Sequence, residues 1–185
     1  ITKRNCQKNK ERGNDIMEAI EAIKTRRSIR NYQDKPVSES DIKELLSAAM
    51  QAPSAGNEQP WQFVVINSRE LLEKIPSIHI YAPMAKKAAI AILVCGDVNA
   101  ERYKGYWVQD CAAATENLLL AAHARGLGAV WCGIYTNEER MKEFSKMFLL
   151  PTNIIPFALV PIGHPAEEKK PENRFKPDRV HYNKW

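Results

Sequence analysis

The sequence of 185 residues lacks the signatures of several common enzyme classes. It contains no GxxxxGK(S/T) phosphate loop, no HExxH zinc pair and no GxSxG nucleophile turn. Its one Gly-x-Gly, at residues 126–128, follows a helical pattern and precedes a strand pattern, the reverse of the order in a dinucleotide-binding turn. The four histidines are scattered singly, so packing or surface positions explain them better than catalysis.

Long apolar runs, cysteine pairs and concentrated positive charge are absent as well. The longest apolar run, residues 88–95, is far shorter than the ~18 residues of a membrane span. The four cysteines show no CxxC spacing, which favours reduced thiols, a cytoplasmic location and no metal site. Residues 1–15 supply +3 of the net charge of +5, so the remainder shows no footprint for a nucleic acid.

What the chain does have is the composition of an ordinary globular protein, with 44% hydrophobic and 26% charged residues. Residues 1–15 are polar and lack apolar periodicity, so we expect a disordered N-terminal extension there. Residues 16–185 are the right length for a single domain.

Apolar periodicity predicts alternating helices and strands along this domain. Capping residues set the predicted helix starts: Ser38 for the second helix, Ser68 for the third, and Thr136 with Glu139 for the last. Prolines set the predicted ends, with Pro76 expected to close the third helix. Helices are expected at 16–25, 39–52, 69–75, 106–125 and 136–150, and strands at 61–66, 88–94, 129–134 and 157–162. The prolines of the last strand favour a position at a sheet edge, or positions near the ends of the strand. The order of elements indicates an α/β or α+β domain.

Two stretches have the character of binding sites. Residues 52–61, the polar loop, contain Ser54, Asn57 and Gln59, whose groups donate and accept hydrogen bonds without charge. Residues 26–30, Arg-Arg-Ser-Ile-Arg, offer guanidinium forks and a hydroxyl that suit a phosphate. An ordinary connector and a helix end decorated with cations are the plain alternatives. Together the stretches favour a phosphorylated ligand with a polar ring, such as flavin mononucleotide (FMN).

Four blocks of the sequence resemble the FMN-dependent nitroreductase family. They are residues 26–30, the polar loop, residues 126–133 after the long helix, and Arg174-Phe175 with residues 179–182 near the C-terminus. The blocks stand in the family order and span the chain from about residue 16 to residue 185. The resemblance implies an α+β fold with a mostly antiparallel sheet flanked by helices, in a homodimer whose C-terminal tails wrap the partner subunit and whose FMN sites lie at the interface.

The resemblance also implies a role for particular residues. Arg174 would reach the phosphate from the tail, with Arg179 as a further candidate. The remaining FMN-binding residues fall into four groups: Arg26, Arg27, Ser28 and Arg30 for the phosphate and ribityl chain; Asn57 and Gln59 for the isoalloxazine edge; Pro53, Ser54 and Ala55 from the other subunit; and Trp131, Cys132 and Gly133 beside the ring.

The implied reaction passes a hydride from NADH or NADPH through the flavin to a nitroaromatic, quinone-like or related small-molecule acceptor. The cofactor carries such chemistry, so no catalytic dyad is required of the protein. Other members of the family use the same scaffold for dehalogenation, flavin fragmentation or azoline oxidation, and these reactions remain alternatives. A non-catalytic flavin-binding protein and a phosphoprotein-binding module are the alternatives outside enzymology.

Overall fold

A single antiparallel sheet forms the centre of the protein. The structure is a computed structural model that describes residues 17–185, so the predicted extension at residues 1–15 lies outside the described residues. The strand order is β1-β2-β5-β3, β4 also pairs with β5, and each of these pairings is antiparallel. The predicted α+β fold with a mostly antiparallel sheet is confirmed. The strands are β1 (Trp61–Ile66), β2 (Ile90–Asp97), β3 (Gly128–Ala129), β4 (Cys132–Gly133) and β5 (Ile154–Gly163).

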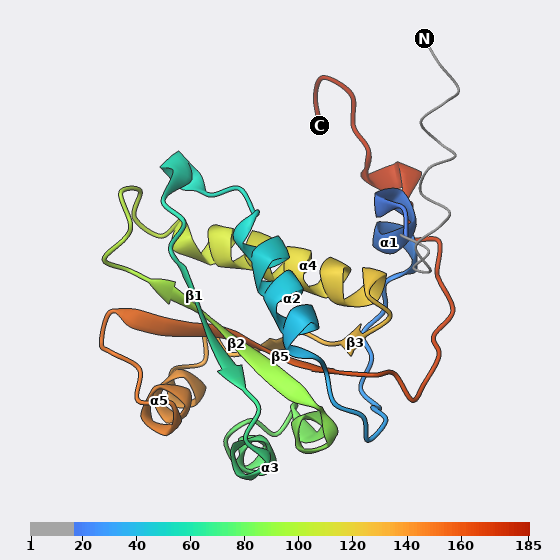
Figure 1. Cartoon of the computed structure of the whole chain (residues 1–185). Coiled ribbons are helices and arrows are strands. Elements are labelled where there is room, and N and C mark those ends of the chain that lie inside the picture. The colour runs from blue at the N-terminus through green and yellow to red at the C-terminus, as the bar shows by residue number, and fades with distance from the viewer. Residues whose placement is uncertain (1–16) are drawn as a thin grey trace.

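Helices cover both faces of this sheet (Figure 1). On one face lie α2 (Glu39–Met50) and α4 (Trp107–Ala124); on the other lie α3 (Arg69–Ile78), the 3-10 helix η2 (Pro83–Lys87) and α5 (Glu138–Met147). β2 contributes to both cores because side chains alternate along a strand. Ile92 and Val94 pack towards α4, whereas Leu93 and Cys95 pack towards α3 and α5. This explains why the strand reads as one continuous apolar run.

The last strand does not lie at the sheet edge, which was one of the two positions that its prolines favoured. β5 is not an edge strand, because β2 pairs with one side of it and β3 and β4 pair with the other. Pro156 lies where the β2–β5 register shifts, so its missing N–H falls at an irregularity. The carbonyl of Pro161 accepts a hydrogen bond from the Tyr32 hydroxyl at 3.1 Å. Prolines are therefore tolerated inside this strand.

Several element ends also differ from their predictions. Ser38 and Ser68 cap α2 and α3 as expected. Pro76, however, lies inside α3 rather than closing it. Asn137, not Thr136, caps α5, and its side chain accepts from the backbone N–H of Arg140 at 2.8 Å. The strand predicted at 129–134 is split into β3 and β4.

The first helix leaves its apolar residues uncovered. α1 (Ala19–Thr25) buries only Ala22, while Ile20 and Ile23 are 62% and 57% exposed. The tail after β5 rises past α1 and includes the 3-10 helix η3 (Pro177–Arg179) (Figure 1). Phe175, Tyr182 and Trp185 in this tail are exposed as well. The apolar face of α1 and the aromatic side chains of the tail thus lie on the surface of the single chain.

Candidate functional site

The polar loop is a tightly hydrogen-bonded turn rather than an open connector. It contains the 3-10 helix η1 (Ala55–Asn57), and the Ser54 hydroxyl accepts from the backbone N–H of Gln59 at 3.0 Å. The side chain of Gln59 donates to the Asn57 amide oxygen at 2.9 Å. Gly56, Asn57 and Gln59 all have positive φ, between 51° and 58°. Asn57 and Gln59 are exposed, so part of their hydrogen-bonding capacity faces outward.

Asp110 at the start of α4 anchors this loop. Its Oδ1 accepts from the backbone N–H of Ala55 at 3.0 Å, and the residue is only 5% exposed. Burial raises the pKa of Asp110 despite this hydrogen bond, and the nearby carboxylates of Glu58 and Glu101 add to the rise. Asp110 was not among the predicted site residues, although a carboxylate within the apolar face of a long helix was a detectable signal.

The basic residues line a cleft with the first part of the tail. This basic cleft, of about 470 Å³, is lined by Arg27, Ser28, Arg30, Lys169, Lys170, Glu172 and Arg174. Five of the lining residues are thus cationic and one is a carboxylate. The structure brings four of the predicted phosphate ligands together, while Lys169, Lys170 and Glu172 were not anticipated. The lysines shortly before Arg174 in the sequence were the signal that could have indicated these residues.

Side chains of the tail bond to the backbone in and beside residues 26–30, the basic segment. Glu167 Oε1 accepts from the N–H groups of Arg30 and Asn31 at 2.5 and 3.2 Å. The hydrogen bond from Arg30 is the main cause of the lowered pKa of Glu167. Lys169 Nζ donates to the carbonyl of Ser28 at 2.8 Å. The tail therefore follows residues 28–31 closely enough to complete the basic cleft.

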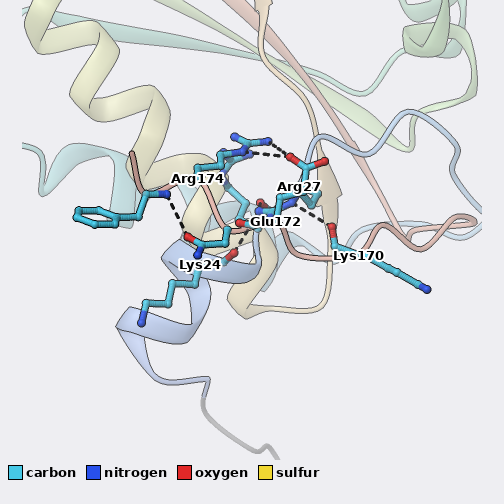
Figure 2. A network of polar contacts seen from close by, with 8 residues as sticks. Lys24, Arg27, Lys170, Glu172 and Arg174 are labelled. Atoms are coloured by element: carbon cyan, nitrogen blue, oxygen red, sulfur yellow. Dashed lines mark hydrogen bonds and ion pairs between the residues drawn. The ribbon is translucent and has the colours of Figure 1, made fainter. Parts of the chain in front are cut away.

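Arg27 links the end of α1 to the tail, as Figure 2 shows. Its guanidinium donates to the carbonyls of Lys24 and Arg26 at 3.1 and 2.6 Å. It also donates to the tail carbonyls of Lys170 and Glu172 at 3.3 and 3.4 Å. Arg174 lies beside this network and pairs with the Glu172 carboxylate at 3.4 Å, with its side chain 67% exposed. Arg27 thus uses its donors on backbone carbonyls, whereas Arg174 stays accessible.

Two predicted residues lie outside the basic cleft. Arg26 pairs with Glu116 of α4, with 3.3 Å between Nε and Oε1, and does not line the cleft. Arg179 lies in η3 and is exposed, also away from the cleft lining. Their roles in cofactor binding stay predictions.

The predicted ring-side segment, residues 131–133, consists of Trp131 in the break between β3 and β4 and of the two residues of β4. Trp131 is half-buried and meets Phe157 edge-to-face, with 5.5 Å between ring centroids. Cys132 is buried, and burial raises its pKa to about 11. Gly133 is exposed, and a Cβ atom there would have no neighbour within 4 Å. The segment therefore presents open backbone at Gly133.

The polar loop and the basic segment lie at opposite ends of α4 (Figure 1). Asp110 in the first turn holds the loop, whereas His123 in the last turn contacts Thr25 at 2.8 Å. At 1.5 Å per residue these positions are about 20 Å apart along the helix axis. One chain therefore does not bring the two predicted halves of the site together.

Comparison with known proteins decides the family. The model of the Nitroreductase family matches residues 23–78 and 78–164.

The chain belongs to the nitroreductase family.

Similar proteins agree with this assignment. A Methanothermobacter thermautotrophicus protein with the provisional name NADH dehydrogenase/NAD(P)H nitroreductase is 52% identical over 91% of this chain and 88% of its own length. The crystal structure of a provisionally named NADH oxidase from Clostridium acetobutylicum has a TM-score of 0.86 at 45% identity, covering 89% of this chain and 99% of that one. An FMN-dependent nitroreductase from Clostridium difficile R20291 has a TM-score of 0.83 at 27% identity, covering 90% and 99%.

Within residues 17–185, no group of three or more His, Cys, Asp or Glu side chains is arranged to hold a metal ion. No helix in that range is both long and apolar enough to span a membrane.

Proposed function

We propose that this chain is an FMN-dependent oxidoreductase that takes a hydride from NADH or NADPH and reduces nitroaromatic, quinone-like or related acceptors. Family membership supports the activity, as does the FMN-dependent nitroreductase that shares the fold. The observation that carries the proposal for this chain is the basic cleft. Five cationic residues line it together with Ser28, and guanidinium and hydroxyl donors suit the phosphate of FMN.

The residues present fit the cofactor at both of its ends. Arg30 and Arg174, with Lys169, would hold the phosphate, and Arg27 would keep the tail in place. The neutral amides of Asn57 and Gln59 would orient the polar ring system. FMN, when bound, supplies the hydride transfer itself, so the protein contributes orientation, hydrogen bonds and exclusion of water.

We further propose that the active form is a homodimer with FMN at the interface. The separation of the polar loop from the basic segment supports this, because a partner subunit would bring one loop to the other basic cleft. Ile23 of α1 and Leu120 of α4 line an exposed apolar groove, and Ile20 beside it is 62% exposed. A second chain that covered this groove and received the tail aromatics would bury both sets of apolar side chains.

The free, buried thiols of Cys95 and Cys111 fit a reducing compartment such as the cytoplasm.

Absorbance spectroscopy tests the cofactor directly. The purified protein, after FMN addition and desalting, is expected to keep a flavin spectrum that NADH or NADPH bleaches and an acceptor restores. A protein that retains no flavin would overturn the proposal. Retained flavin that neither nicotinamide reduces would remove the reductase activity and leave only flavin binding.

Light scattering tests the assembly. A dimer mass is expected for the FMN-loaded protein, and a monomer that keeps FMN would contradict the shared site. The matched variant is Ile23→Glu, which places a charge in the exposed groove without touching the basic cleft. It is expected to lower both the dimer fraction and FMN retention, whereas Lys43→Glu on the exposed surface of α2 is expected to change neither.

A further inference from the structure

We propose that His79 and Arg140 are positioning residues that fix the carbonyl of Gly133 and thereby the ring-side segment 131–133. The Gly133 oxygen accepts from His79 Nε2 at 3.0 Å and from Arg140 Nη1 at 2.8 Å. His79 follows the last residue of α3, and Arg140 lies in the first turn of α5. Two separate elements thus converge on one backbone oxygen, an arrangement we call the Gly133 clamp.

The backbone at this point needs such support. β4 has only two residues, and the next two amides, of Ile134 and Tyr135, both donate to the carbonyl of Phe157 at 3.0 Å. Glycine is the most permissive residue at φ and ψ. A Cβ atom at position 133 would have no neighbour within 4 Å, so side-chain packing does not restrict it either. Besides the pairing of Gly133 with Ala158 of β5, the two donors on its carbonyl are the contacts that hold this peptide in one orientation.

His79 is itself held in one position. It is 2% exposed, its ring meets Tyr81 and Phe144 edge-to-face, and its backbone N–H donates to Ile75. A carbonyl only accepts hydrogen bonds, so Nε2 carries the proton. Nδ1 is buried without a partner, which suits an unprotonated nitrogen. Burial and the neighbouring Arg140 charge both lower the pKa of His79, in agreement with a neutral ring.

Arg140 adds a permanent charge to the same oxygen. Its backbone N–H donates to the cap Asn137, and its guanidinium lies 5.9 Å from the Tyr81 ring centroid. The position of FMN beside residues 131–133 rests on the proposed function, whereas the clamp contacts do not. With FMN there, the Arg140 charge would favour the reduced cofactor, which carries more negative charge than the oxidised one.

Four variants separate the donors from general effects of substitution. His79→Phe keeps an aromatic ring but removes the donor, whereas His79→Gln keeps a donor. Arg140→Met removes the second donor and its charge. Lys142→Met, on the exposed side of α5, removes an equal charge without touching the clamp. Arg140 is half-buried, so Arg140→Met is expected to fold even where His79→Phe does not.

The first measurement uses the protein without FMN. Amide hydrogen exchange at Ile134 and Tyr135 is expected to be at least about tenfold faster in His79→Phe and Arg140→Met, since each loses one of two supports. His79→Gln and Lys142→Met are expected to match the wild type. Nitrogen-15 NMR is expected to find His79 as the Nε2–H tautomer. Unchanged exchange in both donor-deleting variants, or an Nδ1–H tautomer, would overturn the clamp.

The second measurement uses the FMN-loaded protein. The midpoint potential of bound FMN is expected to become more negative in Arg140→Met and to stay unchanged in Lys142→Met. An identical potential in the Arg140 variant would remove the link to the cofactor. A wild-type protein that binds no FMN would refute the proposed function instead, while the exchange and NMR results would still decide the clamp.

Discussion

Replacement of Arg27 is expected to release the tail from the basic cleft. Two of the four hydrogen bonds of Arg27 cross to the tail, at Lys170 and Glu172. A well-formed bond from a charged donor is worth ~1.5–3 kcal/mol. These two are long and reached by solvent, so we take about 1 kcal/mol for each. Arg27→Met is therefore expected to lower the free energy of tail opening by about 2 kcal/mol, which corresponds to about 30-fold more frequent opening.

Limited proteolysis measures this opening. Where the tail closes faster than it is cut, the cleavage rate follows the open population. Trypsin is thus expected to cleave after Lys169, because Pro171 blocks cleavage after Lys170, and to do so about 30-fold faster in Arg27→Met. FMN affinity should fall because the cleft loses its alignment. Arg27→Lys is not expected to rescue either property, since an ammonium lacks the fork that reaches several carbonyls. Lys24→Met, three residues earlier on α1, is the control. Wild-type cleavage in Arg27→Met would show that Glu167 and Lys169 hold the tail without it.

Three further predictions concern the cleft, the loop anchor and the core. Arg174→Ala is expected to weaken FMN binding about tenfold, the loss of one charge-assisted contact, and to leave riboflavin binding unchanged; an equal loss for both ligands would contradict a phosphate contact. Because the pKa of Asp110 is raised in the folded state, stability should fall as pH rises through that pKa. In Asp110→Asn, denaturation across pH should show a smaller dependence of the free energy of unfolding on pH and a higher value at pH 7. Asp110→Ala leaves the Ala55 N–H without its acceptor, so its free energy of unfolding should fall by ~1–3 kcal/mol. Gly96→Ala places a Cβ 2.2 Å from the buried Trp107 ring and is expected to lower the free energy of unfolding by ~1–3 kcal/mol, and an unchanged denaturation midpoint would refute this overlap.

The elements that were predicted correctly depend on local chemistry. The strand at 61–66 has the predicted bounds, and Ser38 and Ser68 cap the helices that follow them. Each of these signals needs only a few neighbouring residues, because a cap satisfies its own first turn and a strand shows its own alternation. The sequence therefore sufficed for the kind and order of most elements.

The errors arise where distant segments meet. The central position of β5 depends on pairing with β2 and with β3 and β4, and none of those contacts is visible from its own residues. The same holds for the basic cleft. The resemblance indicated Arg174, but Lys169 enters the cleft only because Glu167 fixes the tail against the N–H groups of Arg30 and Asn31. Such a register is set by three-dimensional contacts rather than by a motif.

The direction of the pKa shifts supports a reaction carried by a cofactor. Burial raises the pKa of Cys95 to about 12 and that of Cys132 to about 11, so both thiols stay protonated and weakly nucleophilic at neutral pH. His79 shifts the other way, and its Nε2 is occupied by the Gly133 carbonyl. The raised pKa of Asp110 belongs to a carboxyl group that already holds the polar loop through Ala55. These groups shape and hold backbone segments. An enzyme without a catalytic acid or base of its own depends on how its loops are positioned around the cofactor. Variants of the residues that position those loops should therefore alter the affinity for FMN and its midpoint potential before they alter any proton transfer.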